Sequence, residues 1–112
     1  MQLSYLCAKH ADWIYNNPQH ATHFLQRDEL QGVMLFYEGH YTEAIPYLGC
    51  AFDIAAILLE LEEDDSFQLR EKIESLNCLL TQAYEIVGRV DYQQAIAERT
   101  GRLLQALRWR VS

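Results

Sequence analysis

Residues 38–52 read EGHYTEAIPYLGCAF, and a proline stands in the middle of a stretch that otherwise has the composition of a helix. Proline lacks an amide hydrogen and clashes with the preceding turn, so it costs about 3 kcal/mol in a helix interior. If Thr42 is the N-cap, Pro46 is the fourth helical residue, at the edge of the turn whose amides lack intrahelical partners. Pro46 therefore predicts a helix start near Thr42, and Gly39 predicts the end of the preceding helix.

The other breakers divide the rest of the chain in the same way. Pro18, the polar stretch at Asp64–Ser66 and Gly88 each interrupt an apolar pattern. Between them, apolar residues recur at spacings of three and four, which is the helical period, and no strand-like alternation is seen. The sequence predicts an all-α fold of about five helices, over residues 2–16, 19–38, 42–63, 66–88 and 91–110.

The length of 112 residues suits one small domain with a single core. Short connections predict that sequential helices lie antiparallel. The expected order within the domain 1–112 is an extra N-terminal helix in 1–18, a first helical hairpin over 19–63 and a second over 66–110.

The stretch from Gly39 to Ala51 resembles the second half of a tetratricopeptide repeat (TPR). Gly39 matches the inter-helix glycine, Ala44 and Ala51 the small residues of the second helix, and Leu48 the bulky residue between them. Upstream, Gly32 falls at the small position of the first helix. The proline directly after Glu-Ala-Ile is similar to the longer repeats of the kinesin-light-chain type. The resemblance implies two TPR-like hairpins, in which small residues let the helices pack closely.

A second copy departs further from the repeat pattern. SLNCLLTQAYEIVG resembles the first helix of a repeat, and YQQAI echoes the earlier YTEAI. Arg99 and Arg102, however, occupy the positions that Leu48 and Ala51 hold in the first copy. The two copies together cover roughly residues 20–104.

The resemblance implies a function in protein–protein interaction, as an adaptor, chaperone or regulatory module without catalysis. TPR domains bind a peptide or partner helix in the groove lined by their first helices. Transferred residue by residue, the expected partner-binding positions are Gln26, Glu29, Val33, Phe36, Tyr37, Ser75, Cys78, Gln82 and Glu85. The alternative is that the N-terminal helix fills this groove and leaves no open site.

Composition excludes several other classes. Nine basic and sixteen acidic residues give a net charge of −7, which argues against nucleic-acid binding. The acidic residues gather in 53–65 and the arginines in 89–112, a distribution expected of two solvated helix faces. No apolar run approaches the length of a membrane span, and no secretory signal is seen. Three widely spaced cysteines favour a reducing compartment, so the expected location is the cytoplasm.

Signatures of catalysis and of cofactor binding are missing from the sequence. It has no phosphate-binding glycine loop, no nucleophile elbow and no Cys-x-x-Cys pair. We therefore expect neither enzymatic activity nor a cofactor.

One alternative function is a small metal-binding or ligand-binding helical bundle. Cys7 and His10 are three residues apart, as are His20 and His23, so each pair shares one side of a helix. Thiolate and imidazole groups suit zinc, provided that the two pairs face each other across the turn at Pro18.

Two repeats are fewer than the three that a repeat array normally needs to bury its faces, which implies a capping helix, a second copy of the chain or another partner. The last helix carries an apolar stripe that predicts a homodimer, made of Ile96, Leu103, Leu104, Leu107, Trp109 and Val111. Around this stripe, Arg99, Arg102, Arg108 and Arg110 are expected to meet the acidic segment 60–65 of the other chain.

Overall fold

The computed structural model describes residues 3–61 and 67–111, with side chains described up to residue 106. Its helices are α1 (Ala8–Asn16), α2 (Pro18–Tyr37), α3 (Tyr41–Leu61), α4 (Phe67–Ile86) and α5 (Val90–Val111). No strand occurs within these two ranges. The prediction of an all-α fold is confirmed.

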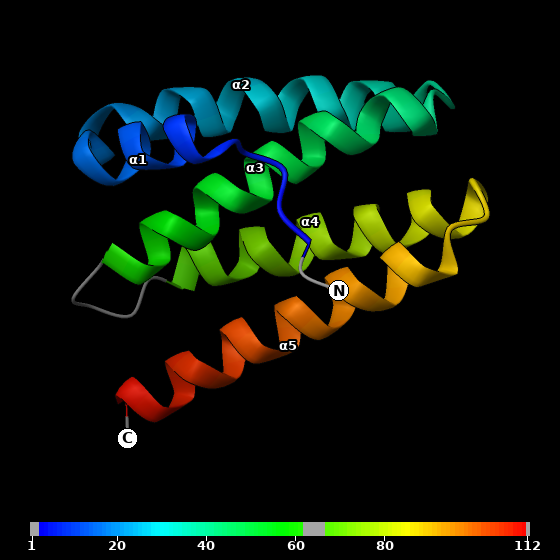
Figure 1. The fold of residues 1–112 in the computed structure, drawn as a ribbon. Coiled ribbons are helices and arrows are strands. Elements are labelled where there is room, and N and C mark those ends of the chain that lie inside the picture. Colours follow the sequence, from blue (N-terminus) through cyan, green and yellow to red (C-terminus); the bar gives the residue numbers. More distant parts are fainter. Residues whose placement is uncertain (1–2, 62–66, 112) are drawn as a thin grey trace.

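Consecutive helices pack side by side in a zigzag (Figure 1). α2 lies on α3, α3 on α4 and α4 on α5, while α1 packs against α3 and α2. Ahead of α1, the chain runs across α3 toward α4 and α5 (Figure 1). The N-terminal part of the chain thus contacts helices that are far away in sequence.

The turns between helices form where the breakers predict them. Gly39 has a φ of +85° and Gly88 a φ of +80°, the left-handed region that favours glycine at a helix end. At each turn, the amide after the glycine donates to the carbonyl five positions earlier, at 2.9 and 2.8 Å respectively. Pro18 is the first residue of α2. These three breaks are confirmed, and the fourth, at Asp64–Ser66, lies outside the described residues.

The predicted N-cap of α3 is wrong. The helix starts at Tyr41, and the amide of Ala44 donates to the carbonyl of His40 at 2.9 Å, so the chain is helical before Thr42. Pro46 is therefore the sixth residue of the helix, and it leaves the carbonyl of Thr42 without its amide donor. Thr42 and Pro46 are both exposed, so water can hydrogen-bond this carbonyl instead.

The predicted first helix, 2–16, is too long, because α1 starts at Ala8 and residues 3–7 are not helical. Backbone groups of this segment bind side chains of later helices, and these tertiary contacts override the local helical spacing. The other predicted helix ends lie within two residues of the observed ones wherever the structure describes them.

Small residues let α2 and α3 approach closely. A Cβ atom on Gly32 would lie 2.8 Å from the side chain of Leu48, and Ala44 and Ala51 are fully buried. The core continues through α4 into α5. Its largest fully buried side chains are Phe52, Leu48, Ile54, Leu59, Ile73, Leu76, Leu80 and Ile96.

α3 is the central helix of the fold. Over an 18-residue window it reaches a mean hydropathy of 1.7, so its length and composition would also allow it to cross a membrane. Within this fold, 67% of that window is buried against the rest of the chain. A charged residue, Asp53, is buried in the middle of this apolar helix.

Candidate functional site

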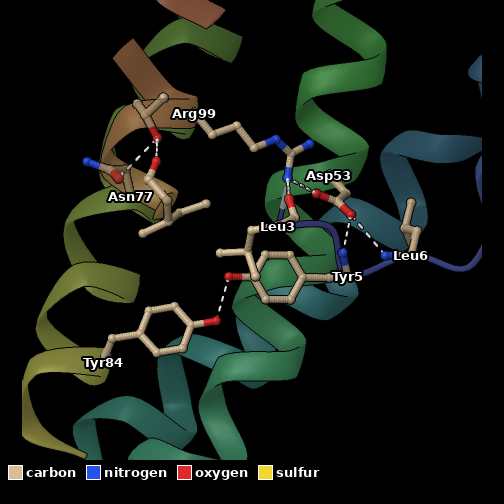
Figure 2. A network of polar contacts seen from close by, with 9 residues as sticks. Leu3, Tyr5, Leu6, Asp53, Asn77, Tyr84 and Arg99 are labelled. Carbon is tan, nitrogen blue, oxygen red and sulfur yellow. Dashed lines mark hydrogen bonds and ion pairs between the residues drawn. The ribbon is translucent and has the colours of Figure 1, made fainter. Parts of the chain in front are cut away.

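Asp53 holds the N-terminal segment against α3. The residue is only 4% exposed, and Oδ2 accepts hydrogen bonds, drawn in Figure 2, from the amides of Tyr5 (2.6 Å) and Leu6 (2.9 Å). Oδ1 pairs with Nη1 of Arg99 at 2.5 Å. A buried carboxylate is tolerated only when it is paired and hydrogen-bonded, and here both oxygens are satisfied.

Arg99 connects α5 to the same segment. Its Nη1 donates both to Asp53 and to the carbonyl of Leu3, the latter at 2.9 Å. The guanidinium also lies 4.9 Å from the ring centroid of Phe52. Together, Asp53 and Arg99 bind two amides and one carbonyl of an extended backbone. We call this arrangement the N-terminal clamp (Asp53 and Arg99 around Leu3, Tyr5 and Leu6).

The side chain of Tyr5 fills a space that Gly49 leaves open. A Cβ atom on Gly49 would lie 2.1 Å from the tyrosine ring. The Tyr5 hydroxyl lies 2.7 Å from that of Tyr84 on α4, and either group can donate (Figure 2). Burial raises the pKa of both phenols above the usual value. The N-terminal segment is thereby tied to α3, α4 and α5 at once.

A second polar contact lies near the clamp, between α4 and α5. Thr100 is buried, and its Oγ1 lies 3.0 Å from Oδ1 of Asn77 and 2.8 Å from the carbonyl of Ile96 (Figure 2). This contact ties α5 to α4 one residue after Arg99.

The predicted partner-binding residues lie on α2 and α4, the first helices of the two hairpins. Apart from the consecutive pair Phe36 and Tyr37, those on each helix are three or four residues apart and so lie along one side of it. An ion pair of 2.8 Å between Nζ of Lys72 and Oε1 of Glu29 links the two helices beside these residues. We call this surface the α2/α4 face; its exposed members are Gln26, Tyr37, Ser75, Cys78, Gln82 and Glu85.

Three of the predicted partner-binding residues are less available to a partner than expected. Phe36 is buried in the core, with its ring centroid 5.2 Å from that of Tyr41, so its assignment as a partner anchor is corrected. Val33 is half-buried against the core, and Glu29 is occupied by the ion pair with Lys72. Tyr37, the next residue, is exposed, so the two consecutive aromatic side chains differ in burial.

The N-terminal helix does not lie on the α2/α4 face. Trp13 of α1 meets Phe24 of α2, with ring centroids 5.4 Å apart, and Phe24 is on a different side of α2 from Gln26 and Tyr37. The segment before α1 enters the clamp between α3 and α5. The alternative in which this helix fills the groove is therefore not what the structure shows.

An apolar stripe on α2 borders the α2/α4 face. Leu30, Met34 and Tyr37 are 63, 50 and 75% exposed, and their spacing puts them on one side of the helix. Only Tyr37 of these three is among the partner-binding residues predicted from the sequence. Leu30 and Met34 could have been found from the spacing of four and three residues that runs from Leu30 through Met34 to Tyr37. A second set of apolar residues, which packs α2 into the core, overlaps this pattern in the sequence. We call these three residues the α2 stripe.

The predicted dimer surface on α5 is only partly exposed. Ile96 is fully buried within the chain, so its assignment to a dimer contact is corrected. Leu103 and Leu104 are half-buried against the core. Arg99 binds Asp53 of its own chain rather than a second copy. The side chains of Leu107, Trp109 and Val111 lie outside the described part, as do those of Arg108 and Arg110, and the homodimer stays a prediction.

The residues of the alternative metal site do not come together. Cys7, His10, His20 and His23 are all exposed. Among the residues that the structure describes, no group of three or more histidine, cysteine, aspartate or glutamate side chains is placed to hold a metal ion. Cys7 also lies outside α1, and the two pairs thus gain no support as a joint site.

Sequence reasoning missed the clamp because it placed Asp53 in a solvated acidic segment and Arg99 on a dimer rim. Two signals were present: Asp53 is a charge among buried apolar residues of α3, and Arg99 interrupts the repeat pattern at the position of Leu48.

Comparisons with models of protein families, with curated proteins and with solved structures find no match to this chain.

Proposed function

We propose that this chain is a TPR-like, non-catalytic protein-interaction module, an adaptor, chaperone or regulatory protein of the cytoplasm. Its partner would be a peptide or a helix that binds on the α2/α4 face. The observation that carries the proposal is the α2 stripe, which leaves three large apolar side chains in water beside that face. Such patches mark interaction sites more often than scattered single residues do.

The two sides of the array differ in a way that supports this assignment. On the α3/α5 side, the chain's own N-terminal segment occupies the clamp. On the α2/α4 face, the polar side chains of Gln26, Gln82 and Glu85 stand exposed close to the stripe. A mixture of apolar anchors and polar groups is typical of the centre and rim of a protein interface.

The resemblance to TPR hairpins is consistent with the packing of the first hairpin. Gly32 and Ala44 stand at its small positions, and Leu48 is fully buried between the two buried alanines. In the second copy, Arg99 stands at the position that corresponds to Leu48 and pairs with Asp53 in the clamp. The proposal therefore places the partner on the first helices, as in that family.

Site-specific photo-cross-linking tests the proposal. A benzophenone amino acid in place of Tyr37 should give a discrete adduct in an extract of the native cell. The same probe in place of Gln94, an exposed residue of α5, is the matched control. The adduct at position 37 should disappear in a Leu30→Glu, Met34→Glu variant, since two charges would stand where the apolar contact forms.

The proposal fails if both probe positions give the same adducts, or if the adduct at position 37 persists in the charged variant. Circular dichroism of that variant serves as the fold control. Leu30 and Met34 are half or more exposed, so their replacement should leave the helical signal unchanged.

A further inference from the structure

A cavity of about 530 Å³ opens between α1, α2 and α3, away from the α2/α4 face. This volume lies within the range of roughly 300–1,000 Å³ that is usual for small-molecule sites. One aromatic side chain comes from each helix: Trp13 from α1, Phe24 from α2 and Tyr47 from α3. The cavity thus combines a suitable size with apolar walls.

The aromatic walls leave ring surface available. Trp13 stands edge-on to Phe24, with centroids 5.4 Å apart, and Arg27 covers the face of Phe24 at 4.9 Å. Trp13 and Tyr47 are each 41% exposed. Large aromatic side chains that line a cavity and stay this exposed offer contact area to an apolar ligand.

A carboxylate with few partners lies in the same cavity. The side chain of Asp28 is only 13% exposed, and its ion pair is with Nε of Arg27 at 3.6 Å, which is longer than a hydrogen bond. Consecutive residues do not face each other on a helix, in line with this long separation. Burial raises the pKa of Asp28, and the neighbouring Arg27 guanidinium only partly offsets this shift.

The other polar side chains that line the cavity are those of His10, Arg27, Tyr47 and Cys50. Cys50 is half-buried, and burial raises the pKa of its thiol to about 11, with the nearby Asp28 charge adding to the shift. The thiol therefore stays protonated at neutral pH and is at most a weak donor. The Arg27 side chain is 62% exposed, so water largely screens its charge.

We propose that this cavity binds a small organic amine with an aromatic or apolar body. The ammonium group donates hydrogen bonds to Asp28, and the body packs against Trp13 and Tyr47. A charge-assisted hydrogen bond in a partly desolvated site is strong, and aromatic faces also attract cations. An organic acid of the same size would bring its negative charge toward Asp28 and is disfavoured.

The test compares three ligands of nearly equal size: 2-phenylethylamine, 2-phenylethanol and 3-phenylpropanoate. A Trp109→Phe substitution leaves Trp13 as the only tryptophan, so its fluorescence reports on the cavity. The amine should bind at least about ten-fold more tightly than the neutral alcohol and the acid. This comparison needs no change at Asp28 and stands even if a variant there fails to fold.

An Asp28→Asn variant locates the contact. It should weaken amine binding by about ten-fold or more and leave binding of the alcohol unchanged. Asp12→Asn, an exposed carboxylate on α1, is the matched control and should affect neither ligand. The proposal is overturned if the acid binds best, if all three ligands bind equally, if none alters Trp13 fluorescence at millimolar concentration, or if a folded Asp28→Asn chain keeps its affinity for the amine.

Discussion

Arg99 of α5 and Asp53 of α3 are 46 residues apart in sequence and form one ion pair, with Nη1 and Oδ1 separated by 2.5 Å. The same two side chains bind the backbone of a third element, through the amides of Tyr5 and Leu6 and the carbonyl of Leu3. The contacts that Asp53 and Arg99 make with the N-terminal segment are to its main-chain groups, so they specify an extended backbone conformation. This clamp explains why residues 3–7 are not helical although the residues that follow them, in α1, are.

Replacing Asp53 should strongly destabilise the fold. Asp53→Ala leaves two amides and the Arg99 guanidinium without their acceptor, a loss of about 3 kcal/mol in the free energy of unfolding. Urea denaturation followed by circular dichroism measures it. Asp12→Ala removes an exposed carboxylate and should hardly change the midpoint. Similar midpoints for the two variants would show that the clamp contributes nothing to stability.

The Tyr5–Tyr84 contact should make stability depend on alkaline pH. The folded chain raises the pKa of Tyr5 above its ordinary value of 10.0, because the phenol is buried. The stabilisation from Tyr5 is therefore complete below about pH 10 and is lost as the pH rises further, since the unfolded chain ionises first. Tyr5→Phe should cost about 1 kcal/mol at pH 7 and flatten the alkaline decline.

Tyr37→Phe is the control for this pH dependence, because the Tyr37 side chain is exposed. Thermal unfolding between pH 8 and 11 should give the same alkaline decline for this variant as for the unchanged chain. A Tyr5→Phe chain that declines as steeply as the unchanged one would contradict the assignment.

The helix boundaries were predictable because their signals are local. Gly39 and Gly88 end helices through their own backbone conformation, and Pro18 fits the first turn through its fixed φ. Pro46 predicted the start of α3 less accurately. It predicted a start at Thr42, but the turn at Gly39 and His40 places the first helical residue at Tyr41.

The clamp and the path of the N-terminus were not predictable in this way. Leu3 and Leu6 are three residues apart, as apolar residues of a helix are, and only the pairing of this segment with Asp53 and Arg99 shows that it is not helical. A pattern along the sequence carries no information on which distant charge a buried carboxylate meets. Even so, an aspartate within a run of buried apolar residues signals that a partner exists.

Two glycines in helices should respond oppositely to alanine. In Gly49→Ala the new Cβ would lie 2.1 Å from the Tyr5 ring, so the N-terminal segment must shift at a cost of about 1–3 kcal/mol. Gly101 has open space around it, and Gly101→Ala should stabilise α5 by up to about 1 kcal/mol through helix propensity alone. In a Tyr5→Ala background, Gly49→Ala should lose its penalty. A penalty that persists there would mean that the clash is with something other than Tyr5.

Phe36 and Tyr37 are adjacent in sequence, but their substitutions should have different effects. Replacing Phe36 should lower stability, and replacing Tyr37 should weaken binding. Phe36 is buried, so Phe36→Ala should lower the free energy of unfolding by about 3 kcal/mol through the cavity it creates. Tyr37 is 75% exposed and belongs to the α2 stripe, so Tyr37→Ala should leave the unfolding midpoint nearly unchanged. Once the cross-linked partner segment is known, its synthetic peptide should bind the Tyr37→Ala chain about ten-fold more weakly, a loss of about 1.4 kcal/mol. Calorimetric titration measures this loss, and unaltered affinity in a stably folded Tyr37→Ala chain would remove Tyr37 from the interface.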